Sequence, residues 1–133
     1  MADHDRPLND RGHKAALGVG KFLHSTYFGA SETPALLPKP DRMISSTAAR
    51  ALATAQHLRE EFNLATEQLL LESRLYLASS QQILDVVQGF DESWNHAFVF
   101  GHNPGMHEFA EHILARAHVT KMPTCTTIIM ALP

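Results

Sequence analysis

The sequence has 133 residues, of which 44% are hydrophobic and 19% are charged, and its net charge is −3. This composition is typical of one folded globular domain and excludes a disordered chain. The small negative charge gives no general reason to expect a nucleic-acid or membrane partner. A single cysteine, Cys125, excludes an intrachain disulfide framework and favours a cytoplasmic location. No apolar run approaches the ~20 residues of a membrane span, and the polar N-terminus is unlike a signal peptide.

The first half of the chain predicts two helices with a loop and a short strand between them. A helix is expected over residues 10–24, after the favourable capping residues Asn9 and Asp10. Three prolines mark residues 25–41 as a surface loop. A brief strand over residues 43–46 and a helix over residues 47–62 follow. The predicted inward positions of the two helices are Ala16, Val19, Phe22, Leu23, Ala48, Leu52, Ala55 and Phe62.

The second half predicts further alternation of strand and helix. Residues 69–71 are a short strand candidate, and residues 75–77 follow as a second apolar run. Ser79 and Gln82 match a capping box at the start of a helix that ends near Gly89, with Ile83, Val86 and Val87 inward. After the strand at residues 97–100, a helix is expected over residues 106–116, and residues 126–130 form a last β-rich run.

The stretch AFVFGHNPG (residues 97–105) places a histidine where a ligand is expected. Its four apolar residues predict a buried strand, and His102 comes between the end of that strand and the next helix. Open α/β sheets bind ligands at this position, where helix N-termini favour anions. An imidazole there can donate to a phosphate and titrate near neutrality. A loop histidine that merely caps the helix is the alternative interpretation.

Three patterns in this order resemble the histidine phosphatase superfamily, the phosphoglycerate-mutase-like fold. They are DRPLNDRG (residues 5–12), SSTAARALATA (residues 45–55) and GHNPG (residues 101–105). The first pattern resembles the small bacterial phosphohistidine phosphatases in particular, and the resemblance covers nearly the whole chain. It implies a three-layer α/β/α fold with a mostly parallel sheet, in one domain over residues 1–133.

The resemblance also implies a reaction and a set of site residues. In that family a histidine attacks phosphorus, and water hydrolyses the resulting phosphohistidine. Carried over by motif, Arg50 is the pocket arginine, His102 is a second histidine that donates to the phosphoryl group, and Arg6 is a further arginine. Asn103 shapes the same loop and joins the phosphate-binding set. The alternative for Arg50 and Arg6 is a solvated surface charge.

One departure from the family pattern is large. The family nucleophile belongs to an Arg-His-Gly or Arg-His-Ala motif at the end of a first, central strand, and neither motif occurs in this sequence. His4 lies in the loop before DRPL, so it is not expected to replace that nucleophile. We therefore expect a chain that is truncated at the N-terminus. The C-terminus also looks short compared with the family pattern. A second protomer could fill the vacant strand position, which would make a homo-oligomer. Little or no turnover is expected for the chain as given.

Other site chemistries fit the sequence less well. Among the nine histidines, His107 and His112 are five positions apart, so they do not share a helix face as zinc-binding HExxH pairs do. Neither a serine-hydrolase elbow nor a glycine-rich nucleotide loop is present. We expect no metal and no cofactor. The expected ligand is a phosphorylated protein or a small phosphate ester, and the alternative to an enzyme is a non-catalytic phosphate-binding remnant.

Overall fold

The computed structural model describes residues 2–26, 39–102 and 104–114, with the side chains of residues 113 and 114 left aside. Within them, three parallel strands form one sheet in the order β2-β1-β3: β1 (Arg42–Ser45), β2 (Leu69–Leu71) and β3 (Ala97–Phe100). Ile44 of β1 lies opposite Leu70 on one side and Val99 on the other. The strands expected at residues 43–46, 69–71 and 97–100 are thus confirmed, the first displaced by one residue.

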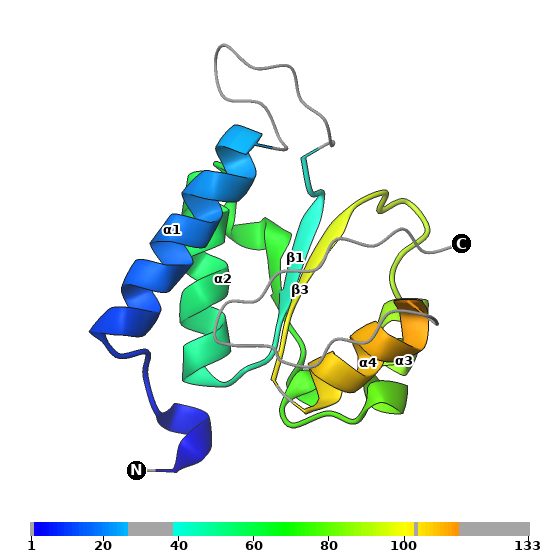
Figure 1. The fold of residues 1–133 in the computed structure, drawn as a ribbon. Coiled ribbons are helices and arrows are strands. Elements are labelled where there is room, and N and C mark those ends of the chain that lie inside the picture. The colour runs from blue at the N-terminus through cyan, green and yellow to red at the C-terminus, as the bar shows by residue number, and fades with distance from the viewer. Residues whose placement is uncertain (1, 27–38, 103, 115–133) are drawn as a thin grey trace.

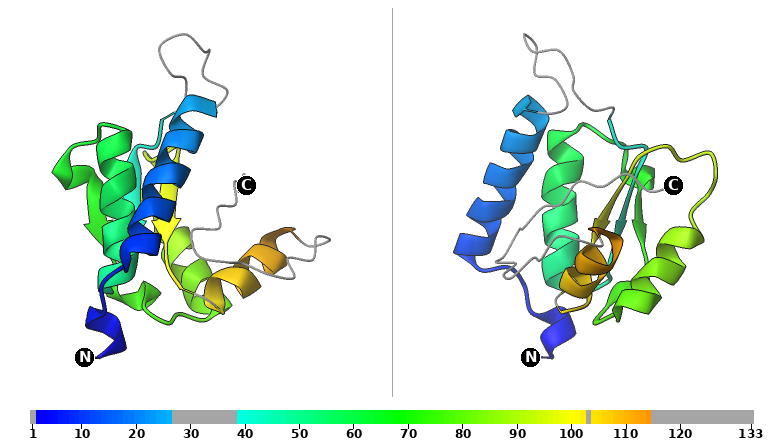
Figure 2. Two further views of the ribbon diagram at one scale, coloured as in Figure 1. Left: turned by 60° about the vertical axis from the view of Figure 1, so that its left-hand side comes forward. Right: turned by 45° about the vertical axis from the view of Figure 1, so that its right-hand side comes forward.

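In the described part of the chain, four helices cover the two faces of this sheet, and Figure 1 and Figure 2 show their arrangement. Helices α1 (Asp10–Thr26) and α2 (Ala49–Glu61) lie on one face, and α3 (Ser80–Gln88) and α4 (Gly105–Leu114) lie on the other. Short 3-10 turns complete the described elements: η1 (Asp3–Asp5), η2 (Thr66–Gln68) and η3 (Ser73–Leu75). The three-layer α/β/α architecture is therefore the expected one. The predicted last strand, residues 126–130, lies outside the described residues, as do Cys125 and most of the predicted loop.

Two hydrophobic clusters hold the layers together because alternate strand residues face opposite sides of a sheet. Met43 packs on α1 and α2 with Leu23, Leu58 and Phe62. Ile44, the next residue, packs on the α3 and α4 side in a cluster with Ile83, Val86 and Phe109. The central strand is consequently buried at three of its four residues, whereas all four residues of β3 are only partly buried.

Local sequence signals explain where the helices begin. Asn9 Oδ1 accepts the Gly12 N–H at 2.8 Å and caps α1. At α3, Ser79 Oγ accepts the Gln82 N–H at 3.2 Å, and Gln82 Oε1 accepts the Ser79 N–H at 2.8 Å. This reciprocal pair is the predicted capping box.

One predicted core position is wrong. Phe22 is 58% exposed, although it was expected on the inward face of α1. The helix packs through Gly12, Ala16, Gly20 and Leu23, which lie three or four positions apart and share one face. Phe22 follows Gly20 by two positions and therefore points away from that face.

Candidate functional site

The carboxyl ends of β1 and β3 meet at one end of the sheet and supply the two loops that carry the predicted site. After β1 the chain turns through residues 46–48 into α2, and after β3 it passes through His102 into α4. The Ser46 N–H donates to the Phe100 carbonyl oxygen at 2.9 Å, which ties the two loops together. The N-terminal segment with η1 lies at this same end of the sheet in Figure 1 and Figure 2.

His102 is fixed against the β1 loop by a buried serine. Its Nε2 lies 2.9 Å from Ser46 Oγ, and that hydroxyl also accepts the Ala48 N–H at 3.2 Å. Ser46 is fully buried. The strand end, the start of α2 and the histidine are therefore connected through one oxygen atom.

Arg50, in the first turn of α2, binds the carboxylate of Asp3 with both arms of its guanidinium. Nη1 donates to Oδ1 at 3.0 Å and Nη2 to Oδ2 at 3.4 Å, and Nη1 also donates to the Asp3 carbonyl oxygen at 3.0 Å. Arg6 Nη2 donates to the same Oδ1 at 3.2 Å, and the Tyr76 hydroxyl donates to Oδ2 at 2.9 Å. One anionic group thus receives hydrogen bonds from three side chains.

Tyr76 connects this carboxylate to His102. Its ring makes an edge-to-face contact with His102 at a centroid separation of 5.4 Å and a second with His4 at 4.9 Å. His4 Nε2 in turn lies 2.8 Å from Thr47 Oγ1, beside Ser46. We call the set Asp3, Arg6, Ser46, Arg50, Tyr76 and His102 the strand-end site.

The charges of the strand-end site shift the protonation equilibria of its members. The hydrogen bond from Arg50, followed by that from Tyr76, lowers the pKa of the Asp3 carboxyl below 3.8. The same bond to Asp3 raises the pKa of Tyr76 above 10.0. Burial, followed by the positive charge of Arg50, lowers the pKa of His102 below 6.5. At neutral pH the site therefore contains an ionised Asp3, a protonated Tyr76 and a neutral His102.

The structure brings the predicted residues together in part. Arg50 and Arg6 share the Asp3 carboxylate, and His102 reaches the same group through Tyr76. Asn103 lies outside the described residues.

His4, which was not expected to replace the family nucleophile, has hydrogen-bond partners for both ring nitrogens. Nε2 contacts Thr47 Oγ1 and Nδ1 lies 2.9 Å from Asp5 Oδ1. Each of these nitrogens would have to lose a partner before it could attack phosphorus.

Sequence reasoning missed three members of the strand-end site: Asp3, Ser46 and Tyr76. Ser46 lies within the SSTAARALATA pattern but was not chosen as a site residue. Asp3 stands in an acidic lead-in that predicts only solvated charges, and Tyr76 belongs to a short apolar run without a motif. The residue after it, Leu77, has a φ of 50°, a left-handed conformation that leucine rarely adopts. Such strain is concentrated at functional sites and is the structural signal that could have drawn attention to this turn.

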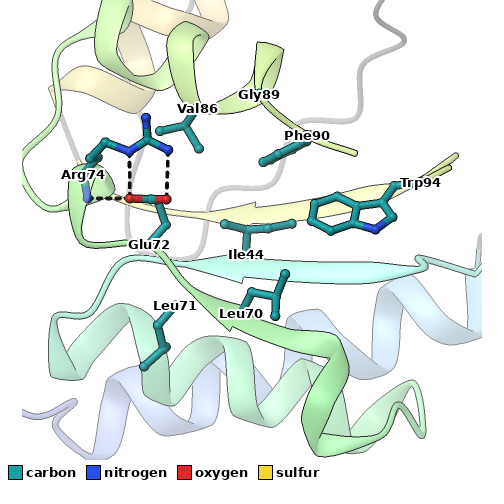
Figure 3. Close-up of a pocket in the computed structure, with 9 residues that line it drawn as sticks. All are labelled: Ile44, Leu70, Leu71, Glu72, Arg74, Val86, Gly89, Phe90 and Trp94. Carbon is teal, nitrogen blue, oxygen red and sulfur yellow. Dashed lines mark hydrogen bonds and ion pairs between the residues drawn. The ribbon is translucent and has the colours of Figure 1, made fainter. Parts of the chain in front are cut away.

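A separate cleft of about 170 Å³ lies beside β2 and is shown in Figure 3. Two of its nine lining residues, Glu72 and Arg74, are charged, and none of the strand-end site residues lines it. Arg74, at its rim, already donates to both carboxylate oxygens of Glu72, at 2.9 and 3.0 Å. Among the residues that line the cleft, Arg74 is the one cation, and the carboxylate of Glu72 balances its charge. The residues that line the cleft are Ile44, Leu70, Leu71, Glu72, Arg74, Val86, Gly89, Phe90 and Trp94.

The described residues contain no group of three or more histidine, cysteine, aspartate or glutamate side chains placed to hold a metal ion. His107, one of the pair considered above, instead contacts Glu111 at 2.7 Å, one helical turn away. In the same part of the chain, every helix is too short or too polar to cross a membrane.

Comparison with known proteins identifies relatives by structure and not by sequence. No protein-family model and no curated protein sequence matches the chain. Among solved structures, a candidate phosphohistidine phosphatase, SixA, from Agrobacterium tumefaciens superposes with a TM-score of 0.70 at 24% identity, over 86% of this chain and 65% of that one. A second candidate SixA, from Nakamurella multipartitia, superposes with a TM-score of 0.65 at 26% identity, over 85% of this chain and 57% of that one.

A phosphoglycerate mutase from Plasmodium falciparum shares the fold at greater distance. Its TM-score is 0.59 at 18% identity, over 82% of this chain and 65% of that one. The chain thus spans less than two thirds of the length of each of these three proteins.

Proposed function

We propose that this chain, which has the fold of the histidine phosphatase superfamily, binds the phosphoryl group of a phosphorylated substrate at the strand-end site. Arg50 and Arg6 supply the positive charge, and His102 and Asn103, which follow β3 in the sequence, complete the proposed phosphate-binding set. The observation that supports this proposal best is the two-armed contact of Arg50 with a carboxylate, 3.0 and 3.4 Å long.

The chemistry of that contact suits a phosphoryl group. A guanidinium is planar, stays protonated, and donates two parallel hydrogen bonds to two oxygens of one anion. Phosphoryl transfer requires fixed donors for the charge on the non-bridging oxygens. Arg50 is suited to this role because α2 fixes its backbone and its side chain is only 26% exposed. Its position in the first turn of a helix adds the positive end of the helix dipole.

For the reaction, we propose hydrolysis of a phosphomonoester or a phosphohistidine through a phosphohistidine intermediate on an attacking histidine. That histidine is not supplied by an Arg-His-Gly or Arg-His-Ala motif in this sequence. The alternative is a phosphate-binding remnant without turnover. The DNA sequence upstream of the Met1 codon distinguishes the hydrolase from the remnant. An in-frame segment that encodes a strand ending in either motif supports the hydrolase, and a stop codon or unrelated sequence supports the remnant.

The phosphoryl-binding role is tested by replacing Arg50 with glutamine and measuring the affinity for inorganic phosphate by calorimetry. We expect Arg50→Gln to weaken binding at least about tenfold, since it removes two charge-assisted hydrogen bonds. Arg74→Gln is the matched control, because Arg74 is exposed and bound to Glu72, away from the strand-end site. Equal affinities for the unsubstituted chain and Arg50→Gln would refute the proposal.

A further inference from the structure

We propose that the carboxylate of Asp3 is an internal competitor at the strand-end site, and that an oxyanion ligand binds by exchanging with it. Asp3 accepts hydrogen bonds from Arg50, Arg6 and Tyr76 at 2.9 to 3.4 Å. The inference rests on the proposed function, because it names the contact that must break when the phosphoryl group arrives.

The geometry indicates competition because the donors are already engaged. Both arms of the Arg50 guanidinium point at the two oxygens of Asp3, as they would at two oxygens of a phosphoryl group. A phosphate that used the same two arms would have to take the place of this carboxylate. The Tyr76 hydroxyl, which donates to Oδ2, would then be free to turn to the ligand. Tyr76 is thereby assigned as a third donor for the bound anion.

The segment that carries Asp3 is built so that it can move at little cost. Its 3-10 turn η1 has three residues, none of them buried, and its N-cap lacks a side-chain hydrogen bond. The side chain of Asp3 is 45% exposed, and partly exposed ion pairs contribute little to stability. The contact between His4 and Thr47 is independent of Asp3, so it keeps the turn near the site when the carboxylate leaves.

Charge decides which ligands can displace Asp3. The carboxylate balances one of the two positive charges of Arg6 and Arg50, so an anion that bound alongside it would be attracted less strongly than one that replaced it. A phosphate dianion gains more from the two guanidinium groups than the single charge of a carboxylate does. Exchange therefore favours dianionic oxyanions over monoanions such as nitrate or acetate.

The test compares Asp3→Asn with Asp5→Asn for the binding of inorganic phosphate at pH 7.5. Asp3→Asn preserves the shape of the side chain and removes its charge. Asp5→Asn makes the same change two residues away, on a carboxylate that contacts His4 and not Arg50. We expect Asp3→Asn to bind phosphate at least about threefold more tightly than the unsubstituted chain. For Asp5→Asn, we expect the fold-change in phosphate affinity to be less than half of the fold-change measured for Asp3→Asn.

The outcomes separate this inference from the function on which it rests. If the unsubstituted chain binds phosphate and Asp3→Asn binds it equally or less well, Asp3 orients Arg50 and does not compete with the ligand. That result refutes the competition and leaves the proposed phosphoryl-binding function standing. If neither chain binds phosphate, both proposals fail together. Thermal unfolding establishes that each variant is folded.

A structure of the unsubstituted chain with bound tungstate decides the matter without any substitution. We expect tungstate on the Arg50 guanidinium and the Asp3 carboxylate displaced from it. Tungstate bound elsewhere, or beside an Arg50–Asp3 pair that remains intact, would overturn the inference.

Discussion

His102 shows how the surroundings of one residue set its chemistry. A histidine in a loop has an ordinary pKa near neutrality. Here burial and the positive charge of Arg50 lower that pKa, and Asp3 opposes the shift. The Nε2 atom is already engaged with Ser46 Oγ at 2.9 Å. At neutral pH His102 is therefore a neutral, oriented ring, and a bound dianion would favour its protonated form.

This shift predicts a pH dependence of stability. Between the folded pKa of His102 and 6.5, the unfolded chain binds more protons than the folded one. The contribution of His102 to the free energy of unfolding is therefore intact above pH 6.5 and decreases as the pH falls through that window. Urea unfolding from pH 5 to 7.5 measures it. His102→Gln should flatten the dependence, whereas His112→Gln, at an exposed position of α4, should leave it almost unchanged. Equal slopes for His102→Gln and the unsubstituted chain would contradict the account.

At the scale of elements, the sequence predicted what depends on local chemistry. The capping box at Ser79 and the β3 strand were predictable because their signals lie within a few residues. The exposed position of Phe22 was not, because the orientation of α1 depends on its contact with α2. Asp3 and Tyr76 were missed for a related reason. Their hydrogen bond joins residues 73 positions apart, and no local pattern encodes such a contact.

Gly105 provides a test of how α4 is seated. A Cβ atom on Gly105 would lie 1.8 Å from the Ala78 carbonyl oxygen, a backbone atom that cannot move aside cheaply. Gly105→Ala should therefore destabilise the fold by about 2 kcal/mol or more. It should also weaken phosphate binding, because α4 follows the His102 loop directly.

Gly18→Ala is the matched control for that substitution. It is also a helical glycine, and its added Cβ would have no atom of the described residues within 4 Å apart from its chain neighbours and the backbone of its own helix. Higher helix propensity should stabilise this variant by about 0.5–1 kcal/mol. Denaturant midpoints measure both effects, and a shift in the same direction for the two variants would count against the packing described here.

At the scale of the whole molecule, the topology accounts for the position of the site. Parallel strands bring their carboxyl ends to one end of the sheet, so residues that follow β1 and β3 meet although they are 56 positions apart. The sequence could predict that Arg50 and His102 follow neighbouring strands. It could not predict that the N-terminal segment would fold onto the same end and place a carboxylate there. The expected vacant strand position remains a prediction. In the described sheet, a further strand could pair only outside β2 or β3.

The central claim is that Arg50 and His102 belong to one anion site at the strand ends. Its most direct test is a titration of the isotopically labelled chain with inorganic phosphate, followed by NMR. We predict saturable shifts that are largest at Arg50, Tyr76 and His102, with little change at the cleft residues Phe90 and Trp94. Saturation that leaves Arg50 and His102 unmoved, or shifts centred on the cleft, would contradict the account.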